Sequence, residues 1–168
     1  MSGRVQQICE ALVNLLDAAD DAEVFSETLN ATRLPSQARE LSDVGESIDV
    51  VVASQITRRD RISNGSYGRY VVVDILIRAH LTNDADADLA TMDSRDELLE
   101  QVDNYLAAEE NSDLTIVDTI AEYVEPTDSR APSEVRDGLG LLWVSDDMTD
   151  MRQRTGIVRV AYWVDESY

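Results

Sequence analysis

The sequence predicts an α+β fold in which helices pack on one face of an antiparallel sheet. Segments with apolar residues at every third or fourth position, typical of amphipathic helices, are interspersed with segments that alternate like strands. The two clearest strand patterns, residues 48–57 and 70–81, are separated by a polar stretch containing Asn64-Gly65, a pair favoured in hairpin turns. Hairpin strands combined with separate helices are typical of an α+β sandwich.

The chain opens with a predicted amphipathic helix at residues 4–19. Its apolar positions are three and four residues apart: Val5, Ile8, Leu12, Leu15 and Leu16. Asp20-Asp21 is expected to end this helix. A strand is expected next over residues 23–32, with one face formed by Phe25, Leu29 and Ala31. Pro35 should end the strand because proline donates no hydrogen bond to a sheet, and residues 34–45 are expected to form a polar connection.

Residues 48–57 and 70–81 are expected to pair as the central hairpin. One face of the first strand carries Ile48, Val50, Val52 and Ile56. One face of the second strand carries Val71, Val73, Ile75, Ile77 and Ala79, and part of the other face carries Val72, Leu76 and His80. Because both faces of the second strand are partly apolar, it is expected to lie inside the sheet.

The second half of the chain starts with a predicted helix at residues 86–108. Its buried stripe is expected to be Leu89, Met92, Leu99, Val102 and Leu106. Carboxylates that favour the helix dipole lie at its start: Asp84, Asp86 and Asp88. Residues 112–124 fit a short helix by apolar spacing and a strand by β-branched content.

The remaining elements are a loop and two strands. Residues 125–140 carry two prolines and two glycines and are expected to form an extended, exposed loop. Short and long strands are expected at 141–144 and 155–164. The last strand should place Ile157, Arg159, Ala161 and Trp163 opposite Val158, Val160, Tyr162 and Val164.

A single domain is expected over residues 1–168, because this length matches one domain with a sizeable core. Hydrophobic residues make up 43% of the chain, which is too many for a disordered protein. No apolar run is long enough to span a bilayer, so no membrane partner is expected. The N-terminus lacks the apolar block of a secretory signal. Cys9 is the single cysteine, so an internal disulfide is excluded.

The charge of the chain is strongly negative, at −20. All 14 basic residues are arginine, and there is no lysine. An acidic, lysine-free composition is typical of proteins from extreme halophiles, where molar salt screens carboxylate repulsion. A GC-rich genome, which favours arginine codons, is the alternative explanation. Either way, duplex DNA binding driven by surface charge is not expected, because phosphate contacts need a basic surface.

The residue types needed for common catalytic sites are scarce. Without lysine the chain can form neither a P-loop nor a Schiff base. One histidine, His80, and one cysteine, Cys9, do not suffice for a zinc site, and no motif surrounds either. The aspartates at 84, 86 and 88 match the first ligands of a calcium loop, but Leu89 and Arg95 occupy its discriminating positions. We therefore expect no enzymatic activity, catalytic residue, cofactor or metal, although a two-carboxylate hydrolase stays open.

One cluster of basic residues is uneven enough to suggest a contact surface. Arg58, Arg59, Arg61 and Arg69 crowd the predicted hairpin connection. They form either a partner-docking loop that meets an acidic neighbour or a solvated loop balanced by acids such as Asp60.

Three stretches carry a resemblance to a known family. They are the opening helix followed by 24–29 and the Pro35 break; the paired patterns 48–52 and 70–77 followed by 96–102; and the closing Asp146-Asp147-Met148, Met151 and 155–163. Together they resemble the tail terminator or tail completion (neck) proteins of long-tailed viruses. The resemblance is one of pattern over most of the chain, and residues 112–140 are longer than the family pattern.

The resemblance implies a structural virion protein with an α+β fold, found at the head–tail junction. Six copies would form a ring that caps the tail tube and joins it to the head connector. The implied partners are further copies of the chain, the tail tube protein and a head connector or completion protein. DNA would pass through the channel without specific binding, past walls expected to be acidic. The alternatives are another neck component, such as a head-completion or connector protein, or a small host binding module or hydrolase.

Overall fold

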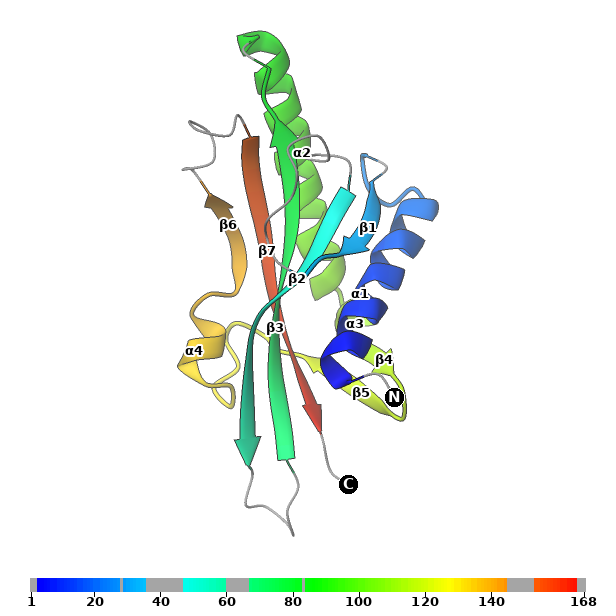
Figure 1. Ribbon diagram of the computed structural model, residues 1–168, viewed down its shortest axis with the longest axis vertical. Coiled ribbons are helices and arrows are strands. Elements are labelled where there is room, and N and C mark those ends of the chain that lie inside the picture. The colour runs from blue at the N-terminus through cyan, green and yellow to red at the C-terminus, as the bar shows by residue number, and fades with distance from the viewer. Residues whose placement is uncertain are drawn as a thin grey trace.

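The computed structural model describes residues 3–27, 29–35, 47–59, 67–82, 84–144 and 153–165 (Figure 1). Its helices and strands, in chain order, are α1 Arg4–Asp21, β1 Asn30–Arg33, β2 Ser47–Arg59, β3 Tyr67–His80, α2 Ala85–Ala107, α3 Glu109–Ser112, β4 Leu114–Ile116, β5 Thr119–Tyr123, α4 Ser133–Arg136, β6 Gly140–Val144 and β7 Gln153–Asp165. This is the α+β class that the sequence predicts.

The seven described strands form one mixed sheet. Their order is β1-β2-β3-β7-β5-β4. On the side of β7 away from β3, β5 pairs with residues 162–164 and β6 pairs with residues 155–159. Strand β1 runs parallel to β2, and every other pairing is antiparallel. The prediction of an antiparallel sheet is therefore right from β2 onward and wrong at β1. The predicted central position of residues 70–81 is confirmed, because β3 lies between β2 and β7.

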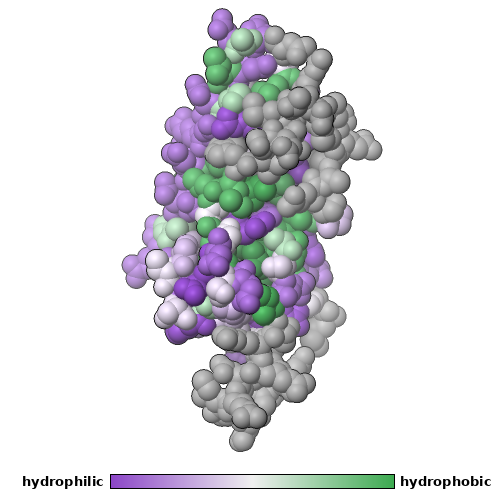
Figure 2. Space-filling model, turned by 90° about the vertical axis from the view of Figure 1, so that its left-hand side faces the viewer, coloured by the Kyte–Doolittle hydropathy of each residue, from purple (hydrophilic) through white to green (hydrophobic). Residues whose placement is uncertain are grey.

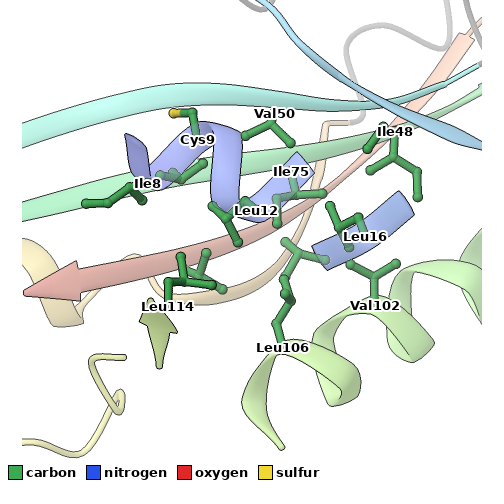
Figure 3. Close-up of a cluster of buried hydrophobic side chains, with 14 of the residues drawn as sticks. Ile8, Cys9, Leu12, Leu16, Ile48, Val50, Ile75, Val102, Leu106 and Leu114 are labelled. Atoms are coloured by element: carbon green, nitrogen blue, oxygen red, sulfur yellow. The ribbon is translucent and has the colours of Figure 1, made fainter. Parts of the chain in front are cut away.

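The main core lies on one face of this sheet, under α1 and α2. Figure 3 shows side chains from both helices meeting those of the central strands. The alternation predicted for the last strand is confirmed, because the core takes only one of its two sets: Val158, Val160, Tyr162 and Val164. The opposite face holds smaller clusters, and one of them includes Val135 of α4. The two long helices thus share a face, whereas the short α4 lies on the other.

The first helix forms as predicted, but most of the strand expected at 23–32 is absent. Glu23 follows α1 with a φ of 56°, a left-handed conformation, and its N–H bonds the carbonyl of Asp20 at 3.0 Å. Phe25 and Leu29 are buried as expected, but only residues 30–33 are extended and paired. The alternation at 23–32 therefore reflects burial of a helix-to-strand connection. The first part of the chain between β1 and β2, up to Pro35, is described, and 36–46 lie outside the described residues.

A bulge in β2 divides the face that the sequence predicts. The pairing with β3 shifts between Val52 and Ser54, so that Ala53 is the extra residue. A bulge of one residue reverses which side chains point to which face. Val52 therefore packs against the main core, whereas Ile56 packs on the opposite face against Tyr70. The prediction that Ile56 shares a face with Ile48, Val50 and Val52 is wrong for this reason.

The second helix begins with the predicted group of aspartates, and the structure shows that the first of them, Asp84, caps it. The side chain of Asp84 accepts hydrogen bonds from the N–H groups of Asp86 and Ala87. Only the C-terminal half of α2 is buried, through Leu98, Leu99, Val102 and Leu106. Leu89, predicted to be buried, is 57% exposed, and Figure 1 shows the first turns of α2 reaching past the sheet. Neither long helix has the length and apolar character needed to cross a membrane, within the described residues.

The segment between α2 and β6 is more ordered than the sequence predicts. Residues 114–123 form the β4–β5 hairpin, so the strand interpretation of 112–124 is right except at α3. Residues 125–140 are not an extended, exposed loop: Ala131 and Val135 are 4% and 1% exposed and pack against Val72 and Ala161 of the sheet. Two buried apolar residues among many polar ones are too few to show a periodicity.

Candidate interaction surfaces

Three of the four arginines predicted to form a docking loop lie at one end of a long arm formed by β2 and β3. Pairing of the two strands continues to Arg58 opposite Gly68 and Arg59 opposite Tyr67. In Figure 1 the paired ends of β2 and β3 reach beyond the helices. Arg69 lies on β3 beside them, and Arg61 lies outside the described residues. The structure therefore brings three of the four predicted residues to one end of the sheet.

Arg69 is not a solvated loop residue. It lies within β3, is half-buried, and its guanidinium donates to the side-chain carbonyl of Gln55 on β2 at 3.4 Å. This bond ties the two strands of the arm together on the core side of the sheet.

The other face of the arm carries an aromatic floor. The rings of Tyr70 and Trp163 lie 4.5 Å apart between centroids, on adjacent strands in direct register. The Trp163 ring also covers Gly68, since a Cβ at that position would lie 1.6 Å from the ring. Glycine is therefore required at 68, because any side chain there would occupy the space of the indole.

A small pocket opens above this floor. It has a volume of about 220 Å³ and is lined by Tyr70, Trp163, Val124, Tyr123, Glu122, Asp128 and Arg130. Arg130 is anchored at the rim by hydrogen bonds to both carboxylate oxygens of Asp128. These hydrogen bonds hold the pKa of Asp128 below its ordinary value. The sequence did not predict this pocket. Its signals were the glycine within one strand pattern, Gly68, and the large aromatic residue Trp163 on the face of the last strand away from the main core.

Two ion pairs are built into the same face of the sheet, nearer its middle. Arg159 of β7 donates twice to Asp74 of β3, at 2.6 and 2.9 Å, and the Asp74 side chain is fully buried. Arg78 pairs with Asp49, and both side chains are at most 4% exposed. The hydrogen bonds that Arg159 donates to Asp74 raise the pKa of the Arg159 guanidinium. Together with Arg95, Arg130 and Arg154, these arginines neutralise carboxylates of their own chain.

The remaining candidate catalytic and metal-binding residues are Cys9, His80, Asp84 and Asp88. Cys9 is fully buried in α1, and burial raises the pKa of its thiol. His80 is exposed at the end of β3. Asp84 caps α2, and Asp88 accepts hydrogen bonds from the backbone and hydroxyl of Thr82. Among the described residues no group of three or more acidic, histidine or cysteine side chains is placed to hold a metal ion.

No protein-family model matches the chain, and no curated protein is similar to it.

Proposed function

We propose that this protein is a structural virion subunit that forms a ring at the head–tail junction of a long-tailed virus. The ring would cap the tail tube and join it to the head connector. The proposal starts from the pattern resemblance to tail terminator proteins. The observation that supports it best is the β2–β3 arm, which projects from the body of an acidic protein and gathers arginines at its end.

The charge distribution gives the arm its role. The chain carries −20, and among the described residues five arginines form ion pairs with carboxylates of the same chain. Four others lie in the twelve residues from Arg58 to Arg69. A basic arm on an acidic body is complementary to the body of a neighbour or to another acidic partner, and such complementarity guides docking and orientation. The arm therefore docks a protein partner.

The same charge governs the channel. In a ring of six such chains most exposed surfaces carry carboxylates, the channel wall included. Cationic side chains on the wall would bind phosphates and release counterions, which would hold passing DNA. An acidic wall avoids this attraction. DNA would then cross the ring without specific binding, and the arginines would face protein.

Charge reversal on the arm tests this proposal. Arg58→Glu/Arg59→Glu should leave the subunit folded and block the joining of heads to tails, so that free heads and tails accumulate. Arg130→Glu is the control, because Arg130 is 83% exposed and belongs to neither β2 nor β3. Normal virion yield from the arm variant would contradict the proposal. Cross-links from the ring to the connector alone, with none to the tail tube, would favour another neck component.

A further inference from the structure

We propose that copies of this chain join edge to edge, with the open edge of β6 in one copy pairing as a strand with the open edge of β2 in the next. The inference rests on the proposed ring and names the contact that holds it. Strand addition of this kind gains main-chain hydrogen bonds, while flanking side chains provide specificity. These two edges stand out because the other outer strands, β1 and β4, are covered by parts of the same chain.

Two outer strands of the sheet are guarded within the chain. At β1, the N–H of Ala31 donates to the carboxylate of Asp17 on α1 at 2.8 Å. At β4, α1 lies alongside the strand, and Arg4 of α1 donates to the carbonyl of Val117 directly after it. Side chains and helices that occupy an edge in this way prevent pairing with another chain.

Among the described residues, no side-chain hydrogen bond occupies the outer edge of β6 or of the arm, although α2 packs near β6. β6 pairs with β7 on one side, and on its other side no described residue pairs with it. Leu141 and Leu142 on this strand are 41% and 38% exposed. β1 covers β2 only from Ser47 to Val50, so residues 51–59 pair with β3 alone among the described strands. An exposed apolar edge strand aggregates unless something covers it.

Both open edges lie in stretches without charge. Residues 138–145 and 50–57 contain no charged side chain, in a chain of which 29% is charged. Figure 2 views the side on which β6 and α4 lie and shows hydrophobic residues gathered across its middle, with hydrophilic residues to the left and below. Two bodies of −20 repel each other least where they meet through uncharged strands. This matching makes a second copy the best occupant of each edge.

The positions of the two edges predict the symmetry. β6 pairs with residues 155–159 of β7, level with the half of β2 that β1 covers. The open part of β2 is level with residues 160–165 of β7, and it lies on the opposite side of the sheet. A contact between two different patches is heterologous, so it repeats from copy to copy and closes as a ring or grows as a filament. A contact of β6 with β6 would instead give a two-fold dimer.

Disulfide trapping between two different variants tests the contact. Leu142→Cys on one tagged chain is mixed with Ser54→Cys, or Ala53→Cys, on an untagged chain in molar salt, and oxidised mildly. The native Cys9 is fully buried, so the introduced thiols are the accessible ones. Strand neighbours bring Cα atoms within the range that a disulfide spans. The matched control replaces Leu142→Cys with Val117→Cys, at an apolar residue that is 59% exposed on the β4–β5 turn.

We expect a tagged–untagged covalent dimer from the edge pair and none from the control or from Leu142→Cys alone. Leu141→Asp/Leu142→Asp should abolish assembly, and Val117→Asp/Ile120→Asp should not, with circular dichroism showing both folded. Three results together would overturn the edge contact and leave the ring standing. The wild-type protein would form rings, Leu142→Cys and Ser54→Cys would not cross-link, and Leu141→Asp/Leu142→Asp would still assemble. The cross-link in open filaments would support the edge contact and overturn the ring. Efficient linkage of Leu142→Cys to itself would overturn the heterologous contact.

Discussion

Removal of one buried carboxylate should destabilise the fold strongly. Asp74→Ala leaves the Arg159 guanidinium, which is 29% exposed, without the carboxylate that accepts its two hydrogen bonds. Breaking a buried pair from one side costs about 3–5 kcal/mol, because the remaining charge stays desolvated. Since Arg159 keeps some contact with solvent, the lower end, about 3 kcal/mol, is the expected loss in the free energy of unfolding.

The assay is urea unfolding at a fixed molar salt concentration, with circular dichroism as the probe. The control is Asp128→Ala, which breaks the chemically similar pair at the surface, where Arg130 is 83% exposed. This control should change stability very little, because exposed pairs are screened and solvated. Asp74→Leu/Arg159→Met should recover most of the loss, because it removes both charges together. If Asp74→Ala costs no more than Asp128→Ala, the idea that burial of this pair holds the sheet face together is refuted.

Three further perturbations have clear expected results. Gly68→Ala should destabilise the fold by about 1–3 kcal/mol, because its Cβ would meet the Trp163 ring. In a chain that already carries Trp163→Ala, the glycine change should be nearly neutral. Additive losses of stability in thermal melts would contradict this. The melting temperature should rise steeply toward molar salt, since unscreened carboxylates at −20 repel, and a flat curve would favour GC bias as the origin of the composition. Burial raises the pKa of Tyr123 to about 12, with Asp103 and Glu125 adding to the effect. Because the fold favours the neutral phenol, this contribution to the free energy of unfolding should be fully present below pH 10 and lost between pH 10 and 12. The fall should be less steep in Tyr123→Phe. Equal slopes for the two proteins would contradict this assignment.

The sequence predicts best where one periodicity persists over a whole element. Residues 71–79 of β3 and 157–164 of β7 alternate without interruption, and both strands were predicted with the correct faces. It predicts less well where a local backbone event changes the phase. Ile56 changes face because of the single extra residue at Ala53, and valine, alanine and serine around it give no sign of a bulge.

Burial without regular structure is the second source of error. Phe25 and Leu29 alternate like strand residues but lie in the connection after α1, where the N–H of Leu29 bonds the Asp20 side chain. The opposite error occurs at 125–140, where proline and glycine suggested an exposed loop and Val135 is buried. Phe25 packs against Tyr105 of α2, and Val135 packs against Val72 and Ala161 of the sheet. These contacts join distant parts of the chain, which a local pattern does not contain.

The arginine cluster was found from the sequence because its unevenness is a property of composition. Its geometry was not, since Arg69 is a strand residue that bonds Gln55 across the arm. The open edges of β6 and β2 could not be predicted either. An edge is defined by what fails to pair with it, and this depends on the order of all strands in the sheet.

The most direct test of the proposed function is the mass and shape of the purified protein. Native mass measurement in a volatile salt at high ionic strength, together with electron microscopy of negatively stained particles in molar salt, would give the number of copies and their symmetry. We expect a closed ring, six-fold by the family resemblance, and detection of the same protein at the neck of the virion. A protein that is monomeric at every concentration and absent from purified virions would contradict it.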